Sequence, residues 1–286
     1  MSPDSSSVSS ASAAPEGGAG EDRGLALEHL RLERPAPGVA LLVLDLPDLR
    51  NAMSQEMTAS WVRAIDHLAA DPELRAVVVT GEGRAFTSGG NTAWLAEGAD
   101  GGVDGLRKRM LPFYRAWLSV RRLEVPTIAA INGPAIGAGL CLALACDIRY
   151  AASGARMGVP FVKLGLHPGM AGTYLLPDVV GPSAARDLML TGRLVDADEA
   201  LGLGLVSRVI EPDAFLDTVL EAAAGIAATA PIASRLTKGA LQRGHADLEA
   251  ALAWESLAQP VTLATEDLQE GIRAVQEKRA PVFHGR

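Results

Sequence analysis

The apolar and polar positions of the chain follow two different periods, which predict strands alternating with helices. Residues 29–34 and 39–46 have strand character and are separated by a Pro-Gly turn, so a hairpin is the simplest prediction. Over residues 54–70, apolar side chains recur at spacings of four, four and three, which predicts an amphipathic helix capped by Ser54. Residues 76–80, "AVVVT", then predict a strand buried on both faces.

The same order of elements returns further along the chain. The pattern predicts a helix at 106–122, a strand at 126–131, a glycine-rich loop, a helix through Leu144 and a strand at 148–152. Strands that alternate with helices indicate an α/β fold with a parallel sheet. Beyond Pro160 the pattern is mostly helical, with helices expected at 172–180, 183–190, 212–229, 232–256 and 266–278.

No Pro/Gly/Ser-rich linker divides the chain after its first residues, so one domain is expected over residues 25–286. Its core should extend to about residue 210, and C-terminal helices should occupy about 211–286. Residues 1–24 are rich in Ser, Ala and Gly and lack the apolar segment of a signal peptide. They are expected to form a disordered tail.

Composition narrows the possible partners. With 48% hydrophobic and 21% charged residues, the chain resembles a soluble globular protein, and its net charge of -8 argues against nucleic-acid or anionic-membrane binding. The apolar run at 129–145 is interrupted by Asn-Gly-Pro and falls short of the roughly 20 residues that cross a bilayer. Cys141 and Cys146 suit neither a disulfide framework nor a metal site, which favours a reducing, cytoplasmic location.

Two glycine-rich loops are the candidates for chemistry. The first, "GEGRAFTSGGN" at 81–91, directly follows the buried strand, and its glycines allow a ligand to approach backbone N–H groups. Asn91 would cap a helix beginning at Thr92. The alternative is a tight strand-to-helix turn without function.

The second loop lies within "INGPAIGAGLCLALACDIRYA" at 131–151, where a strand meets Asn-Gly-Pro and then a helix that opens on Gly137, Ala138 and Gly139. Unpaired N–H groups and the positive end of the helix dipole favour an oxygen that gains negative charge there. Close packing of the helix on the sheet is the alternative interpretation.

Five segments occur together in one order: "RNAMS", the two loops, "GVPFVKLGLHPGMAGTYLLP" and "LTGRLVDADEALGLGLVSRVI". In that order, and at about these separations, they resemble the crotonase (enoyl-CoA hydratase/isomerase) superfamily over residues 28–286. The resemblance implies a spiral of ββα units that assembles into trimers or dimers of trimers. It also implies an acyl-CoA ligand, with no cofactor beyond the CoA moiety.

By the matching motifs, the thioester oxygen would be held by the backbone N–H groups of Ser88 and Ala138. The same match places Arg50, Ala52, Gly89 and Gly137 at the CoA site, and it suggests that Lys278 reaches CoA on a neighbouring subunit. For Arg50 and Lys278 the alternative is an ordinary solvated charge.

The chain departs from the family at both glutamates that hydratases use, since Cys141 and Phe161 stand in their places. Each positioned acid or base contributes about 10²- to 10⁴-fold, so ordinary hydration is doubtful. An oxyanion hole alone contributes roughly 10³-fold, enough for reactions such as decarboxylation of a β-carboxyacyl thioester.

His167 and Cys141 are the candidates to replace the missing acids. His167 lies on the segment that lines the acyl pocket in the family, and histidine is the residue type that most readily transfers protons near neutral pH. The alternative is a histidine that packs against or caps the following helix. For Cys141, a position near a helix N-terminus can lower a thiol pKa, and the alternative is a buried cysteine that acts as a small apolar side chain. Three hypotheses remain: an enzyme with altered proton transfer, a non-catalytic acyl-CoA-binding protein, and a structural protein whose site has decayed.

Overall fold

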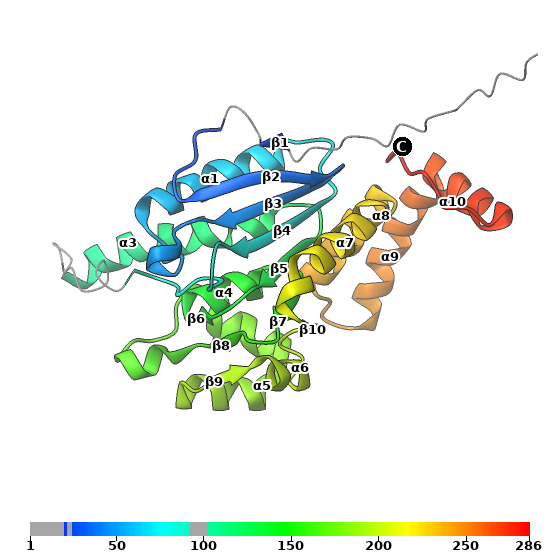
Figure 1. Ribbon diagram of the computed structural model, residues 1–286. Helices are drawn as coiled ribbons and strands as arrows, with labels where there is room; N and C mark the ends of the chain where they lie inside the picture. The colour runs from blue at the N-terminus through cyan, green and yellow to red at the C-terminus, as the bar shows by residue number, and fades with distance from the viewer. Residues whose placement is uncertain (1–19, 22–24, 92–101) are drawn as a thin grey trace, which may run out of the picture.

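A seven-stranded sheet, parallel from its third strand onward, forms the centre of the computed structural model, which describes residues 20–21, 25–91 and 102–286 (Figure 1). In spatial order its strands are β1 (Gly20–Glu21), β2 (Leu30–Ala36), β3 (Val39–Leu44), β4 (Ala76–Gly81), β5 (Thr127–Ile131), β7 (Ile148–Ala152) and β10 (Arg208–Ile210). A second sheet contains β6 (Ala135–Ile136), β8 (Arg156–Gly158) and β9 (Leu194–Asp196). The predicted hairpin is confirmed, because β2 and β3 pair antiparallel.

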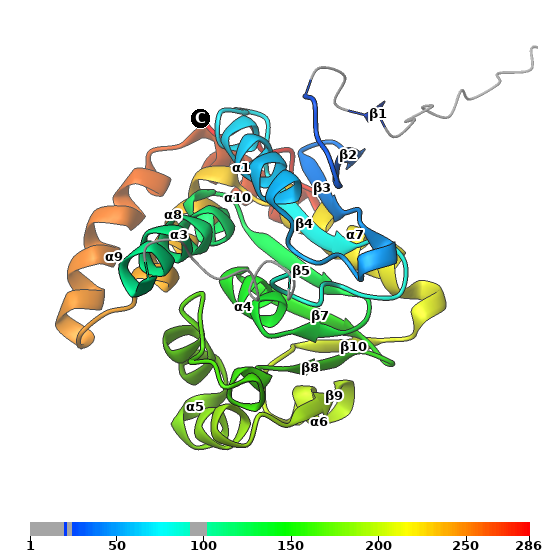
Figure 2. The same cartoon turned by 90° about the vertical axis from the view of Figure 1, so that its left-hand side faces the viewer.

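Helices cover both faces of the large sheet, and they continue beyond it as a C-terminal group (Figures 1 and 2). They are α1 (Gln55–Ala69), α3 (Gly102–Trp117), α4 (Ala138–Ala145), α5 (Gly172–Thr191), α6 (Ala197–Gly202), α7 (Phe215–Ala227), α8 (Pro231–Arg243), α9 (Leu248–Leu263) and α10 (Glu266–Glu277). Short 3-10 helices lie at Pro47–Leu49, Leu118–Arg122, Pro160–Leu164 and Pro212–Ala214. The predicted α/β class with C-terminal helices is therefore confirmed.

Strand β3 explains why the sheet is covered on both sides. All its residues are buried, and successive side chains of a strand point to opposite faces. Ala40, Leu42 and Leu44 pack into the core shared with α1 and α4, whereas Val39, Leu41 and Val43 pack with residues of α7. Such continuous apolar strands are typical of parallel sheets buried between helices.

Helix α1 forms as its sequence pattern predicts. The Ser54 hydroxyl caps it by accepting a hydrogen bond from the Met57 N–H at 3.1 Å. Met57, Trp61 and Ile65 are buried along one face. Trp61 stacks on Trp117, with ring centroids 5.0 Å apart, which fixes the end of α3 against α1.

Three expectations for the helices and the tail were wrong in detail. The single helix expected at 232–256 is two helices, because Gly244 adopts a φ of 60° and Asp247 caps a new helix. The helix expected at 106–122 changes to a 3-10 turn after Trp117. Gly20–Glu21, assigned to the tail, pair with β2, and the remainder of residues 1–24 is outside the described residues.

Among the described helices, no single one is long and apolar enough to span a membrane. The segments Pro212–Ala227 and Pro231–Arg243 meet that test of length and composition only as a pair, which is bent by 107°.

The two glycine-rich loops follow strands β4 and β5, which are parallel neighbours in the sheet. The carboxyl ends of parallel strands lie at the same edge, where open α/β sheets bind their ligands. The topology therefore brings both loops to one place.

Candidate functional site

The two loops are joined directly by backbone hydrogen bonds. Thr87 and Ala135 form a parallel bridge, in which the Thr87 N–H donates to the Pro134 carbonyl at 3.2 Å. The Ile136 N–H donates to the Thr87 carbonyl at 3.1 Å. The first loop is thus an extra strand-like segment against the start of α4, and its position is fixed by the second loop.

Glycine is required at two points of this contact. A Cβ built on Gly89, whose φ is 86°, would lie 2.5 Å from the Ile136 carbonyl oxygen and 3.0 Å from the Ala138 nitrogen. A Cβ built on Gly139 would lie 2.4 Å from the Thr87 carbonyl oxygen. Neither position has room for a side chain, so these glycines allow the first loop to reach the N-terminus of α4.

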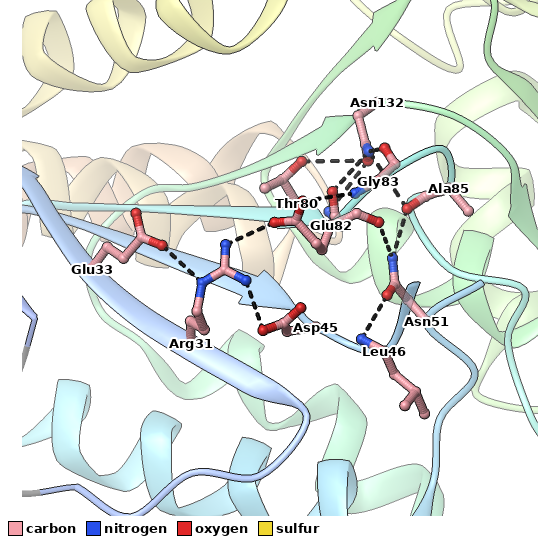
Figure 3. Close-up of polar contacts among 11 residues, drawn as sticks. Arg31, Glu33, Asp45, Leu46, Asn51, Thr80, Glu82, Gly83, Ala85 and Asn132 are labelled. Carbon is pink, nitrogen blue, oxygen red and sulfur yellow. Dashed lines mark hydrogen bonds and ion pairs between the residues drawn. The ribbon is translucent and has the colours of Figure 1, made fainter. Parts of the chain in front are cut away.

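Asn51 holds the first loop in place through hydrogen bonds from its side chain to the loop backbone (Figure 3). It is fully buried with a φ of 54°, and its side-chain Nδ2 donates to the carbonyls of Glu82 and Ala85 at 3.0 and 2.8 Å. Its Oδ1 accepts a hydrogen bond from the Leu46 N–H at 2.9 Å. One side chain therefore ties the end of β3 to the loop.

Asn132 holds the same loop from the other strand (Figure 3). Its Nδ2 donates to the carbonyls of Gly81 and Gly83 at 2.8 and 3.0 Å, and its Oδ1 accepts from the Gly81 N–H at 3.2 Å. Asn51 and Asn132 together fix residues 81–85, the first part of the loop. The residues that contact α4 follow directly after this part.

The backbone N–H of Ser88, expected to be an oxyanion donor, is already in use. It donates to the Arg50 carbonyl at 2.9 Å, so it does not serve an external oxygen. This assignment was wrong because the loop turns its N–H toward the segment before α1, a contact that only the tertiary structure reveals.

The backbone N–H of Gly90 points away from the segment before α1, unlike that of Ser88. Gly90 forms a parallel bridge with Met53, whose N–H donates to the Gly89 carbonyl at 2.9 Å. In such a bridge Met53 bonds to the residues on either side of Gly90, so the Gly90 N–H points away from it. No described residue accepts a hydrogen bond from that N–H. The Gly-Gly pair in the sequence was the signal for this residue, which sequence reasoning missed.

The second predicted donor, Ala138, lies where it was expected. It is the first residue of α4, after Gly137 with a φ of 58° and a ψ of -118°, a conformation that suits glycine. The first N–H groups of a helix have no partner within it, and the helix dipole adds positive potential there. The Ala138 N–H thus remains a candidate donor beside Gly89.

Cys141, one helical turn beyond Ala138, has no lowered pKa. Its side chain is fully buried, and its Sγ lies 3.6 Å from the Gly169 carbonyl oxygen. Burial raises the pKa of the Cys141 thiol to about 12, because a thiolate would be poorly solvated there. The hypothesis of an activated thiol was therefore wrong.

Phe161 and His167 lie on the segment after β8. A Cβ built on Gly137 would be 3.6 Å from Cζ of Phe161, so an apolar ring stands beside the start of α4. His167 is exposed, and its Nδ1 lies 2.8 Å from the Pro168 carbonyl oxygen. Because a carbonyl only accepts, Nδ1 carries the proton. The structure thus places His167 near the segment that touches Cys141 but directs its ring to the surface.

The remaining predicted CoA residues fall into two groups. Arg50 and Ala52 flank the buried Asn51, and the Arg50 side chain is exposed next to the first loop. Lys278 directly follows α10, which Figure 1 shows at the opposite end of the molecule from the loops of the same chain. The start of the helix expected after Asn91 lies outside the described residues.

Comparison with known proteins identifies the family. The model of the enoyl-CoA hydratase/isomerase family matches residues 34–286. The short-chain-enoyl-CoA hydratase of Clostridium acetobutylicum is 37% identical over 255 residues, covering 88% of this chain and 96% of that protein. The crotonyl-CoA hydratase of Syntrophomonas wolfei is 34% identical over 266 residues, covering 91% and 99%.

A solved structure has the same fold. The crystal structure of an enoyl-CoA hydratase from Bacillus anthracis superposes with a TM-score of 0.86 at 32% identity, covering 91% of this chain and all of that one. The expected crotonase-type architecture is therefore confirmed. The chain belongs to the enoyl-CoA hydratase/isomerase family.

Proposed function

We propose that this protein binds an acyl-CoA thioester and polarises its carbonyl with the backbone N–H groups of Gly90 and Ala138. The observation that carries the proposal is the approach of the two loops, since Gly89 has no space for a Cβ against the Ala138 nitrogen. Fixed N–H donors at a helix N-terminus stabilise the negative charge that develops on a thioester oxygen.

We propose a reaction that proceeds through an enolate and does not need two carboxylates to transfer protons. Cys141 keeps its proton, with a pKa of about 12, and the Phe161 ring cannot transfer one. Removing two acids or bases worth about 10²- to 10⁴-fold each leaves hydration very slow. Decarboxylation of a β-carboxyacyl-CoA fits better, because breaking the bond to CO₂ forms the enolate without a base, and an oxyanion donor by itself is worth about 10²- to 10³-fold.

For the CoA moiety we propose contacts with Arg50, Ala52, Gly89 and Gly137. The exposed guanidinium of Arg50 lies next to the first loop and has the charge to bind a phosphate. We propose no cofactor besides the CoA of the substrate.

A trimer or a dimer of trimers is the assembly we propose. Helices α9 and α10 expose apolar side chains in one chain, among them Leu248 at 71%, Leu257 at 72% and Val275 at 80%. Patches of this kind on soluble proteins mark contacts with other chains. In such an assembly Lys278 would serve the CoA site of a neighbour. Light scattering coupled to size-exclusion chromatography measures the mass, and a monomer would contradict the assembly.

A second candidate function is acyl-CoA binding without turnover. The specific observation in its favour is the same replacement of both acids by a protonated thiol and an apolar ring. Ligand binding and turnover have to be measured separately to distinguish the two functions.

The test measures thermal unfolding with free CoA, crotonyl-CoA, malonyl-CoA and a long-chain enoyl-CoA, and follows product formation in the same samples. A ligand that binds the native state raises the midpoint. Stabilisation with turnover supports the enzyme, and stabilisation without turnover of any thioester supports the binding protein. If no CoA compound stabilises the protein, both functions are wrong.

A matched pair of variants locates the site. Proline is tolerated at the first position of a helix and has no N–H, so Ala138→Pro deletes one donor. We expect Ala138→Pro to weaken thioester binding or turnover, and Ser88→Ala to leave both near the wild-type value.

A further inference from the structure

Tyr114 presents a hydroxyl group close to the residues that replace the missing acids. It lies on α3, where the neighbouring Phe113 packs edge-on against it at a ring-centroid distance of 6.2 Å. Phe113 also packs on Trp117, whose Nε1 donates to the Thr58 hydroxyl on α1 at 3.0 Å. This row of aromatic rings fixes the part of α3 that carries Tyr114.

The Tyr114 hydroxyl lies directly against Gly169. A Cβ built on Gly169 would be only 2.6 Å from the phenol oxygen, so this position has to be glycine for the ring to lie there. The carbonyl of the same glycine faces the Cys141 Sγ at 3.6 Å. Tyr114 and Cys141, from two different helices, thus meet at one residue of the segment before α5.

The tyrosine is available as a hydrogen-bond donor. Its side chain is half-buried, and no other described residue bonds to its hydroxyl. Burial and the neighbouring Cys141 raise the pKa of Tyr114, so the phenol keeps its proton at neutral pH. Cys141 and Phe161 provide no comparable donor, since one is fully buried and the other is apolar.

The position of Cys141 indicates which part of a ligand the hydroxyl meets. Cys141 follows Ala138 by three residues, so both lie on one face of α4, about 5–6 Å apart at their Cβ atoms. A thioester held at Ala138 would therefore have its first acyl carbons near Cys141. Cys141 shares the contact with Gly169 and lies close enough to Tyr114 to raise its pKa, so the Tyr114 hydroxyl lies near the same part of the ligand.

We infer that Tyr114 determines specificity, its hydroxyl donating a hydrogen bond to an oxygen on the acyl chain near the thioester. The ligands so selected are 3-hydroxyacyl- and 3-oxoacyl-CoA thioesters, in preference to unsubstituted acyl-CoA. The inference rests on the proposed function, because it takes the two loops as the thioester site. A half-buried hydroxyl that loses its partner with an unsubstituted ligand disfavours that ligand.

Calorimetric titration tests the inference with butyryl-CoA, 3-hydroxybutyryl-CoA and acetoacetyl-CoA. The wild-type protein should bind the two oxygenated thioesters about tenfold more tightly than butyryl-CoA. Tyr114→Phe should bind all three with similar affinity, and it should bind butyryl-CoA at least as tightly as the wild type because the unpartnered hydroxyl is gone. The matched control is Tyr174→Phe, because Tyr174 is 68% exposed on α5 and should keep the preference.

Gly169→Ala is a second variant that retains the hydroxyl but displaces it, and it should also abolish the preference. Circular dichroism establishes that each variant is folded. A wild-type protein that binds butyryl-CoA as tightly as the oxygenated thioesters would overturn the inference, as would a Tyr114→Phe variant that still discriminates. Failure of the wild-type protein to bind any CoA thioester would instead contradict the proposed function itself.

Discussion

The ammonium group of Lys238 lies 2.8 Å from a carboxylate oxygen of Asp147 and joins the C-terminal helices to the sheet. The Lys238 side chain, on α8, is 5% exposed, and the Asp147 side chain, immediately before β7, is 21% exposed. Lys238 also donates to the Val125 carbonyl at 2.7 Å. Asp147 accepts from the backbone and the hydroxyl of Thr127 at 2.7 and 2.8 Å. Asp147 therefore connects β5, β7 and α8.

The two ends of this ion pair should respond differently to substitution. Asp147→Ala leaves a buried ammonium with one carbonyl partner, so we expect it to lower the free energy of unfolding by about 3–5 kcal/mol. Lys238→Met should cost less, because Asp147 retains its bonds to Thr127. Urea denaturation measures both, and a larger loss for Lys238→Met would contradict this account. Arg193, which pairs at the surface with Asp187 and Glu199, provides the control, since Arg193→Ala should destabilise the protein less than either substitution of the buried pair.

Asn51 should stabilise the protein through both its side chain and its backbone. Asn51→Gly keeps the left-handed φ of 54° but leaves buried carbonyls such as that of Ala85 unpaired, at a cost of about 1–3 kcal/mol. Asn51→Ala adds roughly 1–2 kcal/mol of backbone strain to that loss. Chemical denaturation of the two variants should therefore rank alanine below glycine. An alanine variant as stable as the glycine variant would disprove the contribution of backbone strain.

Gly139 should not tolerate even a methyl group. In Gly139→Ala the new Cβ would meet the Thr87 carbonyl oxygen at 2.4 Å and push the first loop away from α4, so affinity for a CoA thioester should fall at least about tenfold. Gly154→Ala is the matched control, because a Cβ there meets no atom within 4 Å. Equal affinities of the two variants, measured by titration, would show that the loops need not touch.

The buried thiols should make the protein sensitive to alkali. Burial raises the pKa of Cys141 and of Cys146 to about 12 from an ordinary value of 9.0. Thiols with a raised folded-state pKa contribute stability that is fully present below pH 9.0 and is lost as the pH rises toward about 12. A variant with both cysteines replaced by alanine should lose stability less steeply between pH 9 and 11 than the wild type. Parallel stability curves for the two proteins would contradict the pKa values.

The clearest sequence patterns predicted elements of the central sheet and the helix that packs on it. Residues 76–80, apolar and β-branched throughout, became β4, and Ser54 capped α1 as its position indicated. Strands β8 and β9 were missed, since three residues are too few to show a period. The break at Gly244 was missed because apolar residues continue on both sides of it.

In the candidate site, the sequence located both loops but not the direction of each N–H group. Ala138 follows from its place at a helix start, which is a local property. The choice between Ser88 and Gly90 depends on Arg50 and Met53, which contact the loop only in the folded chain. For the same reason Tyr114 carried no signal, because its neighbour Gly169 is distant in sequence.

The pairing of β4 with β5 should determine when the protein becomes able to bind a ligand during folding. Gly90 and Ala138 belong to segments distant in sequence, and parallel neighbours of this kind pair late because a long loop must close first. A collapsed intermediate with formed helices but an incomplete sheet would therefore have neither donor in position. Ligand binding during refolding would then report completion of the central sheet, separately from the recovery of helical structure.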